Sequence, residues 1–157
     1  MNLLLQKCTQ PDCEKIQQMQ KAAFAALLEK YRDFDTNPAC ESVERIREKM
    51  NQPQTTWYFI ISGNDVVGGV RLFEIDGRTM RVSPIFILPE HQNKGYAQAA
   101  MIQLERENPQ ADIWELDTIL QEEKLCRLYE KLGYRKTGES YEIKDGMTIV
   151  FYKKTMI

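Results

Sequence analysis

Apolar side chains recur along the first half of the chain with two different spacings. Between residues 9 and 30 they return every three or four positions, which is the repeat of one helix face. Residues 55–75 instead hold two runs rich in β-branched and aromatic side chains, and Gly63-Asn64 between the runs is typical of a hairpin turn. Because residues 80–88 follow a second turn at Asp76-Gly77, we predict an antiparallel meander of three strands.

The second half of the chain alternates helical and extended spacing, so its strands are joined through helices. No repeat or linker interrupts this order. It predicts one α/β domain over residues 1–157, with a mixed central sheet of about seven strands and four helices. The expected strands are residues 3–7, 55–61, 66–75, 80–88, 113–119, 134–143 and 147–154, and the expected helices are residues 9–30, 41–50, 95–107 and 122–132.

Composition narrows the classes of function. A formal net charge of −2 leaves no excess positive field, so we expect neither a nucleic acid nor a membrane surface as the partner. No stretch approaches the roughly 18 to 20 apolar residues of a membrane span, and the first ten residues lack the pattern of a secretory signal. We therefore expect a cytoplasmic protein.

Cysteine and histidine usage argues against a metal site. The four cysteines form no C-x-x-C pair, and His91 is the single histidine. Reduced, mostly buried thiols are the expectation. Trp57 and Trp114 are expected in the core.

The stretch ILPEHQNKGYAQAAM, residues 87–101, joins a strand to a helix through a polar segment with one glycine. A helix start presents unpaired N–H groups and the positive end of the helix dipole, which suits a phosphate or pyrophosphate. Gly95 and Ala97 keep side chains small there, and Lys94 adds a positive charge. From these residues alone an ordinary strand-to-helix turn is an equal alternative. A Walker loop is excluded because no G-x-x-x-x-G-K-[ST] occurs.

The order of these residues resembles the GNAT superfamily of acyl-coenzyme A-dependent N-acyltransferases. Its signature, Gln/Arg-x-x-Gly-x-Gly/Ala, matches Gln92-Asn93-Lys94-Gly95-Tyr96-Ala97 after the run Ile85-Phe86-Ile87-Leu88-Pro89. A second block, LYEKLGYRKTGE at residues 128–139, resembles the late helix and following strand of the family. The resemblance implies the GNAT fold, in which the sheet is splayed between the fourth and fifth strands.

The resemblance also implies acetyl-CoA as the cofactor. Backbone N–H groups of residues 92–97 would hold the coenzyme A pyrophosphate, and residues 85–87 would pair their main chain with the pantetheine arm. The cofactor-binding residues implied in this way are Ile85, Phe86, Ile87, Gln92, Asn93, Lys94, Gly95, Tyr96 and Ala97.

Two residues are implied in the catalysis. Tyr129 matches the family tyrosine that protonates the departing thiolate, although the apolar stripe alone would make it a packed core residue. The N–H of Ile87 would polarise the thioester carbonyl. Glu74, Glu115 and Asp117 are possible bases, each otherwise a solvated strand residue, and a water chain or an already neutral amine stays open.

One part of the family pattern is missing. Members often place Asn seven residues and Ala four residues before the tyrosine, where this chain has Glu122 and Leu125. The cofactor contact of that asparagine is therefore in doubt. Glu122 is expected to serve the helix start instead, where a negative charge is favourable.

The expected reaction is transfer of an acetyl group from acetyl-CoA to a primary amine of a small molecule or peptide, by direct attack in a ternary complex. Asp33, Glu74 and Asp117 are the candidate substrate-binding residues, because acidic side chains attract a cationic amine. The alternative is a non-catalytic acyl-CoA-binding sensor or interaction domain. A homodimer is possible, with the last strand, residues 147–154, pairing across it.

Overall fold

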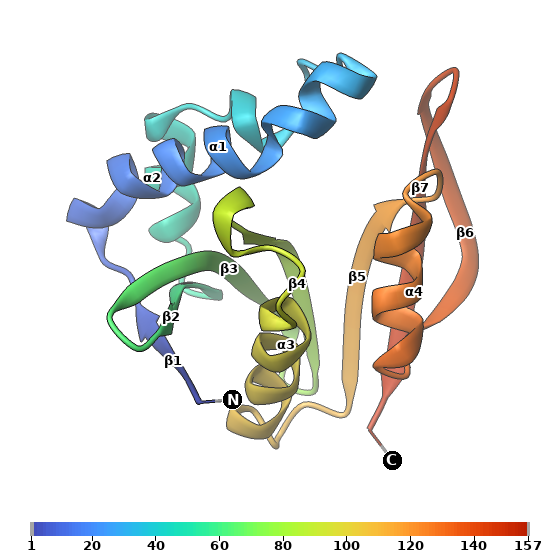
Figure 1. Ribbon diagram of the computed structural model, residues 1–157. Coiled ribbons are helices and arrows are strands. Elements are labelled where there is room, and N and C mark those ends of the chain that lie inside the picture. The colour runs from blue at the N-terminus through green and yellow to red at the C-terminus, as the bar shows by residue number, and fades with distance from the viewer. Residues whose placement is uncertain (1, 157) are drawn as a thin grey trace.

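One mixed sheet of seven strands, in the order β1-β2-β3-β4-β5-β7-β6, organises the computed structural model, which describes residues 2–156 (Figure 1). The helices and strands lie within a few residues of the ranges predicted from the sequence. The strands are β1 (Leu3–Lys7), β2 (Thr55–Ser62), β3 (Asp65–Asp76), β4 (Thr79–Ile87), β5 (Ile113–Ile119), β6 (Arg135–Lys144) and β7 (Met147–Thr155). The helices are α1 (Cys13–Tyr31), α2 (Val43–Met50), α3 (Tyr96–Glu107) and α4 (Glu123–Lys131), with short 3-10 turns η1 (Gln10–Asp12), η2 (Pro38–Cys40) and η3 (Pro89–His91).

The two faces of the sheet carry separate hydrophobic cores. On one face, α3 and α4 pack over a cluster that includes Trp114 and Leu116 of β5, and we call it the α3/α4 face. On the other, α1 and α2 cover a smaller cluster around Trp57 and Phe86, which we call the α1/α2 face. Both tryptophans are buried, as predicted. Three of the four cysteines are buried and all four are free thiols, while Cys40 is exposed.

The sheet is divided between β4 and β5. These strands pair in parallel only where residues 79–81 face residues 113–115. Figure 1 shows β4 and β5 close together at their lower ends and diverging above. We call the divided part of the sheet, from Val82 on β4 and Leu116 on β5 onward, the opening. The predicted splay between the fourth and fifth strands is confirmed.

A β-bulge on β4 begins where the opening begins. Val70 of β3 faces Ile85 and Leu72 faces Val82, so the single residue Arg71 is opposite both Ser83 and Pro84. The extra residue reverses which side chains point to which face. Val82 before the bulge belongs to the core under α3 and α4, whereas Phe86 after the bulge, four residues later, belongs to the core under α1 and α2.

Two boundaries differ from the sequence expectation. The second helix begins at Val43 rather than at residue 41, because Ser42 accepts a hydrogen bond from the N–H of Arg45 at 3.1 Å and so caps the helix. The turn between β3 and β4 consists of residues 77–78 rather than Asp76-Gly77, because Asp76 is still paired with Thr79.

The expectation that the last strand pairs across a dimer is wrong. β7 lies between β5 and β6 and pairs with both, so its main chain is already used within the sheet. The edge strand at this end of the sheet is β6, which is exposed along almost its whole length.

Gly68 on β3 lets the backbone of β4 approach closely, and this contact is testable. A Cβ at position 68 would lie 2.1 Å from the carbonyl oxygen of Phe86, which is a backbone atom and cannot rotate away. We predict that Gly68→Ala lowers the free energy of unfolding by about 1 to 3 kcal/mol, the usual cost of overpacking. Urea denaturation measures this, with Gly77→Ala as control because nothing lies within 4 Å of a Cβ there. Equal stability of the two variants would contradict the predicted steric conflict.

Candidate active site

The segment between β4 and α3 leaves a run of backbone amides without acceptors. Asn93 and Gly95 have positive φ angles of 65° and 82°, which turns the chain sharply before α3. Among residues 2–156, the N–H groups from Asn93 to Gln98 donate to no backbone or side-chain acceptor, and regular pairing resumes when Ala99 donates to the carbonyl of Gly95 at 3.1 Å. Free amides together with the positive end of the helix dipole suit a diphosphate or another anion.

Polar contacts hold this segment in place on both sides. Gln92 Nε2 donates to the carbonyl oxygen of Ile87 at 2.9 Å and so ties the segment to the end of β4. Lys124, in the first turn of α4, donates to the side-chain oxygen of Asn93. Lys124 therefore places an ammonium group beside the segment, and Lys94 within it adds a second positive charge, which would favour a negatively charged ligand.

The main chain of β4 faces the opening with unpaired groups. Leu88 donates its N–H to the carbonyl of Val67 at 2.8 Å, toward β3. Because successive N–H groups of a strand point in opposite directions, the N–H groups of Ile87 and Ile85 point toward the opening. In the described part of the chain no strand pairs there, since the pairing of β4 with β5 ends at Arg81. An extended ligand can therefore form main-chain hydrogen bonds with this edge, as an additional strand would.

Tyr129 of α4 is buried, yet its hydroxyl has no partner. Its ring lies 6.3 Å from the ring of Tyr134 and 6.4 Å from that of Tyr152 between centroids. Within residues 2–156 the hydroxyl makes no hydrogen bond and is not one of the fully enclosed polar atoms, so it reaches solvent-accessible space. Burial, together with the charge of Asp117 and with Cys126, raises the pKa of Tyr129, so its hydroxyl stays protonated and can donate a proton.

Of the carboxylates considered from the sequence, Asp117 and Glu115 lie beside the opening. Both are on β5 and point to the α1/α2 face, because their neighbours Trp114 and Leu116 belong to the core of the other face. Asp117 forms an ion pair with Arg81 of β4. The carboxylate of Asp117 thus stands where β4 and β5 begin to separate.

The other two acidic candidates lie elsewhere. Asp33 is buried just after α1, and its carboxylate accepts from the N–H of Thr36 at 3.2 Å and from the Thr36 hydroxyl within its own turn. Glu74 of β3 is paired with Met80, at the closed end of the sheet where β4 and β5 are joined. The structure therefore brings Asp117 to the opening, but it does not bring Asp33 and Glu74 together there.

Glu122 connects α4 to α1, a contact that sequence reasoning missed. Its carboxylate lies 2.7 Å from Lys30 Nζ and also accepts a hydrogen bond from the Tyr31 hydroxyl. Burial alone would raise the pKa of the Glu122 carboxyl, but the bonds from Lys30 and Tyr31 outweigh it and hold the pKa below its usual value. Glu122 is the N-cap residue of α4, at the helix start where the sequence placed it, but its side chain makes no capping hydrogen bond and contacts Lys30 and Tyr31 instead.

The chain belongs to the acetyltransferase (GNAT) family, whose model matches residues 21–134, more than half of the sequence. The match includes the free amides before α3 and Tyr129. As a member the protein is an acyl-CoA-dependent N-acyltransferase with acetyl-CoA as its cofactor. The unpaired amides from Asn93 to Gln98 and the unpaired edge of β4 fit that cofactor. A search of the curated proteins by sequence finds no match.

Solved structures of acetyltransferases share this fold. A chimeric spermidine N-acetyltransferase from Vibrio cholerae has a TM-score of 0.79 at 20% identity, covering 99% of this chain and 96% of that chain. An acetyltransferase from Thermus thermophilus has a TM-score of 0.78 at 14% identity, covering 99% and 97%. A Vibrio cholerae spermidine N-acetyltransferase in complex with CoA and spermine has a TM-score of 0.77 at 20% identity, covering 98% and 95%. In the described residues, no helix is long and apolar enough to cross a membrane.

The contact of Glu122 with α1 predicts a pH-dependent loss of stability. A carboxyl with a lowered pKa in the folded state stabilises the fold above its unfolded pKa and loses this effect as the pH falls through the folded value. We therefore predict that Glu122→Gln lowers the melting temperature by roughly 2 to 4 °C at pH 7, and that the difference from wild type disappears as the pH falls through the lowered pKa of Glu122 in the folded state.

The neighbouring residue provides a matched control. Glu123 has the same charge, is 82% exposed, and among residues 2–156 pairs only with Arg127, at 4.0 Å. Glu123→Gln is expected to change the melting temperature little at any pH. If both variants melted alike across the pH range, the Lys30–Glu122–Tyr31 contact would not stabilise the fold.

Proposed function

We propose that this protein transfers an acetyl group from acetyl-CoA to a primary amine of a small molecule or peptide, by direct attack in a ternary complex. The observation that supports this most is the opening, which joins the two faces of the sheet. The free amides before α3 lie on the α3/α4 side, while Asp117 lies on the α1/α2 side. Both reactants can therefore be bound at once, and no covalent enzyme intermediate is required.

In this proposal the N–H of Ile87 polarises the carbonyl of the thioester, because it points into the opening without a partner. The amine nitrogen forms a bond to the carbonyl carbon as the carbon–sulfur bond breaks. Tyr129 gives its hydroxyl proton to the departing sulfur, and burial keeps that proton in place until then. Acetyl-CoA supplies the acetyl group as an activated thioester.

The attacking amine must also lose a proton. With a reference pKa of roughly 10.4, forming the neutral amine at pH 7 costs about 4 to 5 kcal/mol. Asp117 is the carboxylate best placed to receive this proton or to attract the ammonium, because it lies at the start of the opening and its charge acts on Tyr129. Glu115, two residues earlier on the same face, is the second candidate.

Release of thiol in the presence of amines tests the proposed reaction. We expect free coenzyme A to appear faster with at least one primary amine than without acceptor, and not with the N-acetylated form of the same amine. Binding of acetyl-CoA should be measured in parallel as a rise in melting temperature. If acetyl-CoA stabilised the protein but none of the amines accelerated thiol release, the protein would instead be a non-catalytic binding domain.

Tyr129→Phe isolates the role of the hydroxyl. Because this hydroxyl has no hydrogen-bond partner, its removal leaves no buried group unsatisfied and should not disturb the fold. We predict a fall in kcat of about tenfold or more, with the stabilisation by coenzyme A retained, as for loss of one proton-transfer group. Tyr134→Phe is the matched control, since its hydroxyl donates to Glu105 at 2.8 Å instead. An unchanged kcat in Tyr129→Phe would remove Tyr129 from the mechanism.

A further inference from the structure

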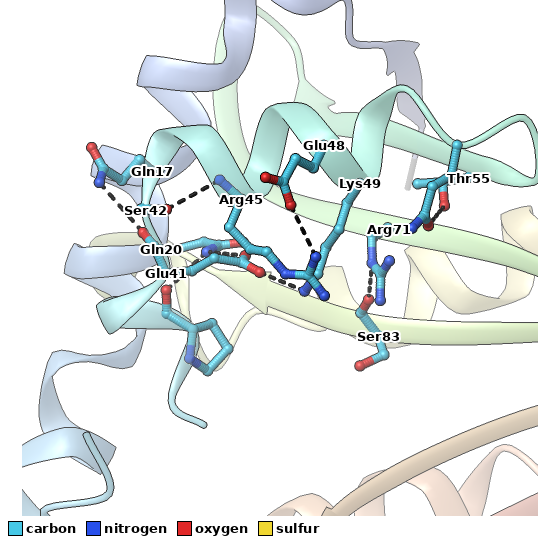
Figure 2. A network of polar contacts seen from close by, with 12 residues as sticks. Gln17, Gln20, Glu41, Ser42, Arg45, Glu48, Lys49, Thr55, Arg71 and Ser83 are labelled. Carbon is cyan, nitrogen blue, oxygen red and sulfur yellow. Dashed lines mark hydrogen bonds and ion pairs between the residues drawn. The ribbon is translucent and has the colours of Figure 1, made fainter. Parts of the chain in front are cut away.

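Arg71 of β3 is fixed by the bulge that begins the opening. Its Nε donates to the carbonyl oxygen of Ser83 at 2.6 Å, a group freed by the extra residue on β4. Its neighbours Val70 and Leu72 belong to the core under α3 and α4, so Arg71 points to the α1/α2 face. Figure 2 shows its guanidinium between α2 and Ser83.

The charged side chains near Arg71 are already paired with other residues. The charged groups that act on it are Glu41, Arg81 and Arg45. Glu41 is already bound by Lys49 and accepts from Gln20 at 3.2 Å (Figure 2). Arg81 is paired with Asp117, and Arg45 Nη1 lies 3.1 Å from Glu48.

Within residues 2–156, Arg71 forms no ion pair, although it is half-buried. A guanidinium carries five N–H donors, and the one on Nε is used. A partly buried cation with no anion costs free energy, and proteins usually offset that cost with a carboxylate or a ligand. With Nε bonded to the main chain, the Nη1–Nη2 edge is free to bind two oxygens of one anion.

Arg71 lies on the face of the sheet where the acceptor would bind, away from the proposed cofactor site. The diphosphate site lies before α3, on the far side of the sheet. Arg71 is on the α1/α2 face beside Ser83, next to the ion pair of Arg81 and Asp117 at the start of the opening. A small molecule whose amine enters the opening near Asp117 would have the rest of its structure on this face.

We propose that the acceptor carries an anionic group, a carboxylate or a phosphate, in addition to its primary amine, and that Arg71 binds that anion. This inference rests on the proposed N-acetyltransfer and names the class of its acceptor. An amino acid or a peptide with a nearby carboxylate has this chemistry, and so does an amino-alkyl phosphate. A purely cationic polyamine does not. Arg71 then sets specificity, while the reacting groups are those of the opening.

Matched acceptors test the proposal, with thiol release as the readout. Lysine and cadaverine differ by one carboxylate, and phosphoethanolamine and ethanolamine differ by one phosphate. We expect wild type to prefer the anionic member of at least one pair by tenfold or more in kcat/KM, the effect of one charge-assisted bond. Whichever pair shows the preference identifies carboxylate or phosphate as the anion.

Arg71→Gln should remove this preference, mainly through a higher KM for the anionic acceptor, while the rise in melting temperature with coenzyme A is kept. Arg45→Gln is the matched control, because it removes an arginine of the same region that is 56% exposed and already paired. It should leave the preference within about twofold of wild type. If Arg71→Gln fails to fold, Arg71→Lys keeps the charge without the two-pronged edge and should lose part of the preference.

The experiment distinguishes failure of the inference about Arg71 from failure of the proposed function. Turnover that favours cadaverine and ethanolamine in wild type, or a preference unchanged in Arg71→Gln, would overturn the inference and leave N-acetyltransfer intact. Absence of turnover with every amine would overturn the proposed function. The inference would then be judged by the melting temperature of the coenzyme A complex, which the anionic members should raise in wild type and not in Arg71→Gln. If the anionic members produced no such rise in wild type, the inference about Arg71 would be overturned as well.

Discussion

The separation of β4 from β5 is the constraint on which the rest of the structure depends. Hydrogen bonds between neighbouring strands normally continue along a sheet, and here they stop after Arg81. The bulge opposite Arg71 reverses the side-chain directions of β4 and leaves its main chain facing the opening. Unpaired main-chain groups are costly when buried, so the open edge of β4 is suited to a ligand that completes the sheet.

The two faces of the sheet that meet at the opening carry different polar and charged groups. On the α3/α4 side, the free amides before α3 and the ammonium group of Lys124 favour a polyanionic cofactor. On the α1/α2 side, Asp117 is paired with Arg81, and Arg71 lies beside the bulge with its Nε bonded to the main chain. Tyr129 belongs to the core of the α3/α4 face, where burial raises the pKa of its hydroxyl and keeps it protonated.

The parts predicted from the sequence were those set by local patterns. Alternating apolar residues in β5 gave its bounds to the residue, and the motif from Gln92 to Ala97 located the free amides. The parts that were missed depend on residues far apart in the chain. Glu122 meets Lys30 and Tyr31 some 90 positions away, and Arg71 binds a carbonyl exposed by a bulge on another strand. No spacing rule relates such residues, because their meeting depends on the packing of whole elements.

Titration calorimetry with coenzyme A and with pantetheine tests the central claim most directly. If the amides before α3 grip the diphosphate, coenzyme A will bind one to one, and pantetheine, which lacks the diphosphate, will bind about 100-fold more weakly. Equal affinities, or no heat with coenzyme A in low-salt buffer, would contradict the account.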